Sequence, residues 1–262
     1  MMEVVDSVER WKGTGEDLVF HDTIVILRQG SRHFFARQDG KARNINLDNL
    51  KSIEEIPETF MYTPLPDGLT QAPDPLPENV YIKRANMIHY YPGMNGCDDI
   101  VEEAKVYEKL RLHPHKNIAR YHGCLVENGM FYALCIEKYP ATLSQRQDDL
   151  STEDKKRIMR DIRSGVAHLH SLGLVHNDLN PSNIVLTDDG TAVIIDFDSC
   201  RPAGERIGVK GATPFWEVDS EYALPENDLQ QVNQIERSLF EEPTAESEPE
   251  PEPESEPVRV DK

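Results

Sequence analysis

The chain has 262 residues, which is enough for one two-lobed domain or two small domains. It carries 28 Lys and Arg against 47 Asp and Glu, and the net charge of −19 argues against nucleic acid as a partner, because phosphate neutralisation needs basic patches. No apolar stretch approaches a membrane span, no signal peptide is visible, and the four cysteines form no CxxC pair, so we expect an intracellular protein, cytoplasmic or nuclear, without membrane contact, disulfides or a zinc site.

Residues 1–78 are predicted to form an N-terminal extension. A β-hairpin is expected where residues 23–27 and 33–37 flank a turn that contains Gly30. A proline-rich linker follows at 64–79, and an ordinary hairpin is excluded there because proline cannot donate to a strand ladder. The predicted hairpin therefore either supplies strands to the next domain from a distance or forms an unrelated cap.

Residues 79–240 are interpreted as the main domain. Apolar patterning and a capping box at Ser151 predict four elements: a strand at 80–83, a helix at 99–110, a buried strand at 131–136 and a helix from about 151 to 171. The strand ends in Lys83.

A polar loop at 176–183 precedes a second predicted hairpin. Its strands, 184–186 and 192–195, flank a turn that contains Asp-Gly. Because a hairpin returns the chain to its start, Asp178 and Asn183 of the loop should converge with Asp196. These side chains offer a carboxylate that can act as a base, and an amide and a carboxylate that can hold a hard cation. Phosphoryl transfer needs these groups.

The loop His-Asn-Asp-Leu-Asn-Pro-Ser-Asn at 176–183 and Asp-Phe-Asp at 196–198 resemble the H-R-D-L-K-P-x-N and D-F-G motifs of protein kinases. By this resemblance, Asp178 is the catalytic base, while Asn183 and Asp196 bind magnesium.

The same resemblance extends upstream to the nucleotide site. It implies that Lys83 and Glu103 form the ion pair that orients ATP, with Glu102 as the alternative one residue away. It also implies that Ile136 is the gatekeeper, and that the hinge from Glu137 to Tyr139 meets adenine through its backbone.

Several letters depart from the kinase pattern. Asn177 replaces the arginine before the base, Asn180 replaces a lysine, and Asp198 replaces a glycine. The loss of the lysine removes a positive charge from the transition state. Asn180 and Asp198 also occur in small-molecule kinases of the aminoglycoside and choline type. No glycine-rich loop precedes Lys83, which favours a pseudokinase.

The C-terminal side resembles protein kinases in two places. The stretch 208–216, with Thr213 followed by proline, resembles the segment that docks peptide substrates, and Asp228 begins a helix resembling the central helix of the large lobe. No late helices of the large lobe follow. Residues 241–262 hold a Glu-Pro repeat, which predicts a disordered acidic tail.

These patterns predict an α+β, bilobal protein kinase-like fold with a reduced N-lobe and a truncated C-lobe, similar to short kinase-like proteins of filamentous fungi. The expected function is ATP- and Mg-dependent phosphorylation of protein Ser/Thr hydroxyls. The alternatives are a pseudokinase scaffold with little turnover and a small-molecule kinase. ATP and a protein substrate are the expected partners, and the oligomeric state is left open.

Overall fold

The structure is a computed structural model that describes residues 2–13, 17–93, 95–207, 213 and 216–241. Its strands are β1 (Glu3–Lys12), β2 (Val19–Gln29), β3 (Arg32–Gln38), β4 (Lys51–Ile56), β5 (Thr63–Pro64), β6 (Val80–Arg84), β7 (Tyr121–Glu127), β8 (Met130–Glu137), β9 (Ala141–Thr142), β10 (Leu174–Val175), β11 (Ile184–Leu186), β12 (Ala192–Ile194) and β13 (Arg201–Pro202). Its α-helices are α1 (Glu58–Met61), α2 (Gly96–Leu112), α3 (Leu143–Arg146), α4 (Thr152–Ser171) and α5 (Pro225–Phe240). Short 3-10 helices are η2 (Ala42–Asn44), η3 (Leu47–Asn49), η4 (Met87–His89) and η5 (Gln147–Asp149).

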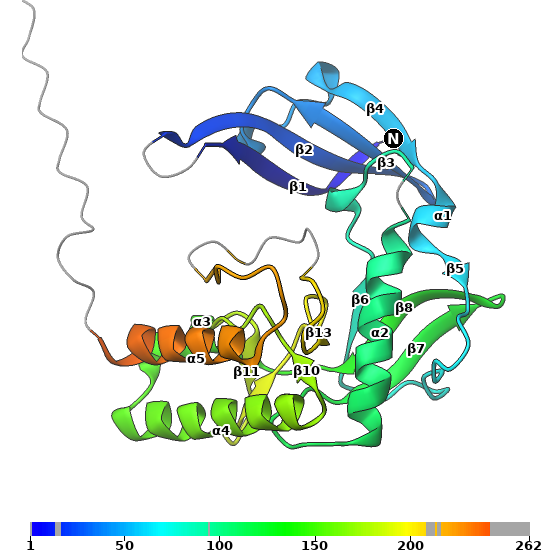
Figure 1. Cartoon of the computed structure of the whole chain (residues 1–262). Helices are drawn as coiled ribbons and strands as arrows, with labels where there is room; N and C mark the ends of the chain where they lie inside the picture. Colours follow the sequence, from blue (N-terminus) through cyan, green and yellow to red (C-terminus); the bar gives the residue numbers. More distant parts are fainter. Residues whose placement is uncertain (1, 14–16, 94, 208–212, 214–215, 242–262) are drawn as a thin grey trace, which may run out of the picture.

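The elements form two lobes below a separate N-terminal sheet (Figure 1). One lobe holds β5 to β8 and α2, and the other holds α3 to α5 with the short strands β9 to β13. The predicted α+β, bilobal fold is confirmed. Within the described residues, no helix is long and apolar enough to cross a membrane. Most of the predicted substrate-docking stretch at 208–216, and all of the predicted acidic tail after Glu241, lie outside the described residues.

The N-terminal sheet is an antiparallel meander in the order β1-β2-β3-β4. Its central hairpin, β2 and β3, turns at Gly30, whose φ of +63° suits glycine. Successive residues of a strand point to opposite sides, and in β2 both sets are buried. Ile24 and Ile26 belong to the main core, whereas Val25 and Leu27 form a second cluster on the opposite face. None of its strands pairs with β6, β7 or β8 among the described residues.

Aromatic rings join this sheet to the N-terminal end of α2. Phe35 of β3 lies 5.8 Å from Tyr90, and Tyr90 lies 5.3 Å from Phe60 of α1, measured between ring centroids. Phe60 in turn packs on Gly96, the first residue of α2, so closely that a Cβ on Gly96 would lie 2.4 Å from the ring. The position of α2 therefore depends on the sheet above it.

The second sheet is centred on β8, which pairs with β5, β6 and β7. The proline-rich linker leaves β5 and runs along the outer edge of β7. Cys124 of β7 donates its N–H to Thr70 O at 2.7 Å and accepts from Ala72 N at 2.9 Å. Gly123 permits this approach, because its φ is +124° and a Cβ there would lie 2.5 Å from Ala72 N. The linker thus forms no hairpin before β6.

The larger lobe is built on α4, which starts at the predicted cap. Ser151 Oγ accepts the N–H of Asp154 at 3.1 Å. Buried aliphatic residues of α4, spaced as in an amphipathic helix, face the core: Ile158, Ile162, Val166 and Leu169. The neighbouring helix α5 packs against α4 and begins near β10 (Figure 1).

Replacing Phe60 by alanine should lower the free energy of unfolding by about 3–5 kcal/mol, because the substitution leaves a cavity between the N-terminal sheet and α2. Denaturant titration of the full chain measures this change. Leu112→Ala is the matched control, since Leu112 is 67% exposed at the other end of α2 and its removal should change stability by less than about 0.5 kcal/mol. Equal effects of the two substitutions would contradict the proposed packing.

Candidate active site

Lys83 joins three segments of the chain. Its Nζ lies 2.7 Å from Glu103 Oε2 on α2 and 2.5 Å from Asp196 Oδ1 after β12. The Glu103 side chain is fully buried, and that of Lys83 is 19% exposed. Glu102, the alternative partner considered from the sequence, instead pairs at the surface with Lys105 at 2.6 Å.

Burial and neighbouring charges shift the pKa values of Lys83 and Glu103. Burial alone would lower the pKa of Lys83, but the charges of Glu103, Asp196 and Asp198 together outweigh it and raise this pKa above its ordinary value. For Glu103, burial is the largest effect and raises the pKa to about 7, because the attraction of Lys83 offsets it only in part and Asp196 adds repulsion.

The loop at 176–183 is held from below by α5. Asp228, fully buried, accepts the backbone N–H groups of His176 at 3.0 Å and Asn177 at 2.8 Å, and its Oδ2 lies 2.8 Å from His170 Nε2. Gln231, one turn further along α5, donates to the carbonyl of Asn177 at 3.1 Å. Asn177 has a φ of +65°, a left-handed conformation that asparagine tolerates better than most residues.

Asp178 lies at the open side of this loop. Its Oδ2 accepts from Asn183 Nδ2 at 3.1 Å, and its Oδ1 accepts from Thr213 Oγ1 at 2.9 Å and from the Thr213 N–H at 3.1 Å. Asn180 Nδ2 contacts both Thr213 Oγ1, at 3.2 Å, and Asp178 Oδ1, at 3.4 Å. The carboxylate is therefore oriented by hydrogen bonds from three side chains.

The hairpin β11–β12 brings Asn183 beside Asp196, because Ile195 donates its N–H to the carbonyl of Asn183 at 3.0 Å. The amide nitrogen of Asn183 is bonded to Asp178, whereas its amide oxygen has no hydrogen bond within the described residues. One carboxylate and one amide oxygen suit Mg²⁺, which usually binds few protein ligands together with substrate phosphates. The described part of the chain contains no cluster of three or more His, Cys, Asp or Glu residues that could hold a metal alone.

A cavity of about 320 Å³ adjoins these groups, a volume typical of small-molecule sites. It is lined by Tyr81, Lys83, Glu103, Tyr107, Ile136, Glu137, Lys138, Tyr139, Ser182, Asn183, Val185, Ile195 and Asp196. Seven of the eight site residues named from the sequence line it, and Asp178 lies outside its lining. The N–H of Tyr139 makes no hydrogen bond to a described residue.

Two contributions were missed from the sequence. Tyr81, a residue that is 55% exposed, lines the cavity; it lies two residues before Lys83 and hence on the same face of β6. Gln231 holds the loop from the buried face of α5. Gln231 could have been found, since it lies three residues after Asp228 in a predicted helix and so shares its face.

Known protein kinases are similar in sequence to part of this chain. The serine/threonine-protein kinase Tao of Drosophila melanogaster is 29% identical over 124 residues, which is 45% of this chain and 11% of that protein. The stress-activated protein kinase jnk-1 of Caenorhabditis elegans is 34% identical over 138 residues, which is 49% of this chain and 29% of that protein. The chain therefore spans less than a third of the length of these relatives.

A solved structure of the yeast RNA Pol II CTD kinase CTDK-1 complex matches with a TM-score of 0.52 and 19% identity, covering 62% of this chain and 54% of that chain. At this identity the likeness shows the fold alone. The model of the protein kinase domain family matches residues 78–237, which is more than half of the sequence. The chain belongs to the protein kinase domain family.

Proposed function

We propose that this chain is an ATP- and Mg-dependent kinase that transfers the γ-phosphate of ATP to Ser or Thr hydroxyls of a protein. The observation that carries the proposal is the double ion pair of Lys83 with Glu103 and Asp196, beside a loop that orients Asp178. Kinase chemistry requires a lysine that is held by a glutamate, a metal-binding aspartate and a positioned base in one site.

Each of these residues has a role in the proposed reaction. Lys83, held by Glu103, would contact phosphate oxygens of ATP, and Tyr139 together with Ile136 and Glu137 would meet adenine. Asn183 and Asp196 would hold Mg²⁺, which supplies positive charge to the phosphates. Asp178 would accept the hydroxyl proton of the substrate as its oxygen attacks the γ-phosphorus and the bond to ADP breaks.

A protein substrate is favoured over a small molecule by Thr213. Its hydroxyl binds Asp178 and accepts from Asn180, so the stretch expected to dock a peptide is bonded to the expected base. Two relatives reported above are named as protein kinases, and one of these as a serine/threonine-protein kinase.

A binding module with little turnover is the second candidate. The specific observation behind it is the route of the proline-rich linker, which lies along β7 and so provides no backbone amides above the phosphates. Asn180 also lacks the positive charge of a lysine.

We also propose the same division of the chain as inferred from the sequence: an extension at 1–78, a kinase domain at 79–240 and a tail at 241–262. The four cysteines are buried and free, which agrees with an intracellular location.

Asp178→Ala and Asp196→Ala should abolish transfer of a labelled γ-phosphate to a protein acceptor, with a loss of at least about 100-fold, because the base or the metal ligand is removed. Asp188→Ala, on the exposed turn of the same hairpin, should leave transfer unchanged. The thermal shift with Mg-ATP separates nucleotide binding from phosphate transfer, since of these two variants only Asp196→Ala should reduce the shift strongly.

If the wild-type chain transfers no labelled phosphate and shows no thermal shift with Mg-ATP, the kinase proposal is refuted. A shift without label would support the binding module, and label only on small hydroxylated acceptors would indicate a small-molecule kinase.

Glu103→Gln should change how stability depends on pH. In the folded chain burial raises the pKa of Glu103 to about 7, above the ordinary value of 4.5. Between these two values the unfolded chain releases the proton and the folded chain keeps it, so wild-type stability falls as pH rises through this window. The Gln variant lacks this titration, and its stability relative to wild type should rise by about 2–3 kcal/mol from about pH 4 to about pH 8.

Denaturant titrations without nucleotide or metal, at several pH values, measure this difference. Glu102→Gln is the matched control, because Glu102 is the exposed neighbour of Glu103 and pairs with Lys105 at the surface. Parallel pH profiles of Glu103→Gln and wild type would show that Glu103 is already ionised at low pH, contrary to the expectation.

A further inference from the structure

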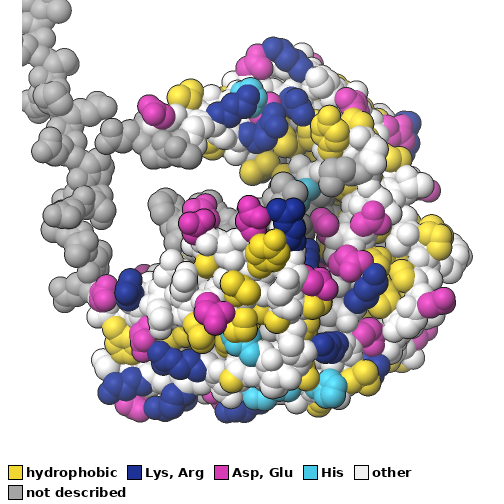
Figure 2. All heavy atoms as spheres, viewed as in Figure 1, with side chains coloured by type: hydrophobic (Ala, Val, Ile, Leu, Met, Phe, Trp, Pro, Cys, Tyr) yellow, Lys and Arg dark blue, Asp and Glu magenta, His cyan; other side chains and the backbone are white. Residues whose placement is uncertain are grey.

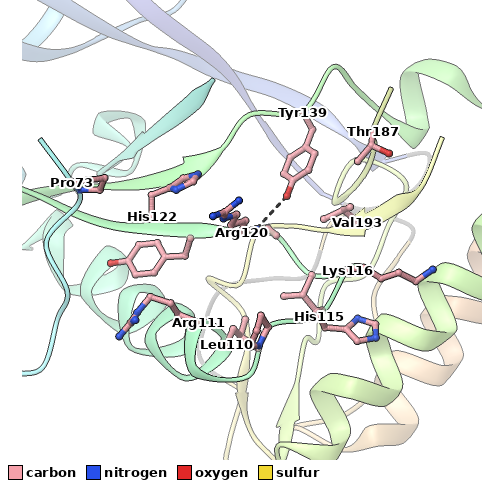
Figure 3. Close-up of a pocket in the computed structure, with 14 residues that line it drawn as sticks. Pro73, Leu110, Arg111, His115, Lys116, Arg120, His122, Tyr139, Thr187 and Val193 are labelled. Atoms are coloured by element: carbon pink, nitrogen blue, oxygen red, sulfur yellow. Dashed lines mark hydrogen bonds between the residues drawn. The ribbon is translucent and has the colours of Figure 1, made fainter. Parts of the chain in front are cut away.

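A second and larger cavity, of about 730 Å³, is drawn in Figure 3. It shares Tyr139 with the cavity of about 320 Å³ beside Lys83, which we call the nucleotide cavity. The lining of the larger cavity comprises Pro73, Leu110, Arg111, Pro114, His115, Lys116, Ile118, Ala119, Arg120, Tyr121, His122, Tyr139, Thr187 and Val193. We call it the rear groove. Five of these side chains are Arg, Lys or His, and none is acidic, in a chain whose net charge is −19.

The carboxylates that pair with these cations lie beneath them. Lys116 is 70% exposed while its partner Asp161 is 11% exposed, and Arg111 is 37% exposed while its partner Glu108 is 13% exposed. Both carboxylates also accept hydrogen bonds from the backbone, from Ala192 N in the first case and Thr70 N in the second. In both pairs the cationic group is therefore the more exposed partner, and the carboxylate is the more buried one.

Arg120 makes no ion pair within the described residues, and Figure 3 shows its side chain at the centre of the groove. His122 Nε2 lies 2.7 Å from Glu137 Oε2. The pKa of His115 is lowered, first by burial and then by His168 and Lys116, so it adds no charge at neutral pH. Among the described residues, Arg111 and Lys116 keep carboxylate partners, and Arg120 is the arginine of the groove without one.

The remaining walls are suited to an extended peptide. Pro73, Pro114 and Ile118 supply apolar surface between the cationic groups.

We propose that the acidic C-terminal segment of this same chain, residues 241–262, docks in the rear groove. It contains nine acidic and two basic residues, and Glu alternates with Pro from Glu248 to Glu254. Alternating proline favours the extended polyproline II conformation, which loses little entropy on binding. Carboxylates would then meet Arg111, Lys116 and Arg120, and prolines would lie on the apolar walls.

The connection is long enough. α5 is attached to α4 through Arg163 and Glu236, which are 2.7 Å apart, and Asp161 on α4 holds Lys116 of the groove. Glu236 and Lys116 therefore both contact α4, at positions only two residues apart. The seven residues from Glu241 to Glu248 span about 22 Å in a polyproline II conformation, which is about twice the diameter of one helix.

Docking there would place the segment against the hinge. Tyr139 lines both the rear groove and the nucleotide cavity, and its Oη accepts the N–H of Arg120 at 3.2 Å. The segment would thus contact a residue that the nucleotide also contacts.

A nitroxide at Pro251→Cys in the full chain tests the proposal. All four native cysteines are buried, so the label reacts with the introduced one. Paramagnetic broadening should appear at the backbone amides of residues 115–122 and Thr187, and not over the N-terminal sheet.

Arg120→Glu should lower the docked-to-free ratio about fivefold or more, because it turns an attraction into a repulsion. Arg160→Glu is the matched control, an exposed arginine on α4 outside the groove, and should leave the ratio unchanged. Replacing Glu248, Glu250, Glu252 and Glu254 by Gln tests the same contact without altering the groove, and should also remove the broadening.

Three results would overturn the proposal. The first is absent or uniform broadening in the wild-type groove. The second is an equal effect of Arg120→Glu and Arg160→Glu, which would indicate a general attraction. The third is broadening of an isotope-labelled chain by a separate spin-labelled chain, which would place the segment on a second copy.

Discussion

The double ion pair of Lys83 is the constraint on which the rest of the site depends. Taking Lys83 and Glu103 out of water is costly, and the cost is offset only while both carboxylates stay within reach of the ammonium group. β6, α2 and the segment at Asp196 must therefore keep one arrangement. Because α2 rests on Phe60, the N-terminal sheet contributes to that arrangement although it lies outside the kinase match. Figure 2, which has the same view as Figure 1, shows that the surface is hollowed between this sheet and the larger lobe.

The loop that carries Asp178 depends on a second buried carboxylate. Asp228 binds two backbone N–H groups of the loop, and Gln231 binds further backbone groups from the same helix face. One helix, α5, thus fixes the conformation of the loop. Asn177 fits the left-handed backbone there and donates to the carbonyls of Val175 and Ser199, so its side chain reinforces the loop from within.

Local patterns in the sequence predicted the strand of Lys83, the helix of Glu103, and the loop and hairpin around Asp178, and the resemblance to kinase motifs singled out Lys83 and Glu103 within them. The outer strands of the N-terminal sheet were missed. β1 is mostly exposed and β4 is exposed except at Ile56, so neither has the apolar alternation that marks a strand. The course of the linker depends on Gly123 and on Glu108, which binds Thr70 from 38 residues away. Contacts of that kind are set by tertiary packing.

Two departures from the kinase pattern both affect how the negative charge of the transferred phosphate is neutralised. Asn180 brings no positive charge to the transferred phosphate, and the linker, bound along β7, brings no backbone amides to it. Under the proposed function, Lys83 and the cation held by Asn183 and Asp196 must balance most of the phosphate charge. Lys83 is itself shared between two carboxylates. Under the proposed function, metal binding would therefore carry more of the electrostatic stabilisation in this site than in one with a phosphate loop and a lysine at position 180.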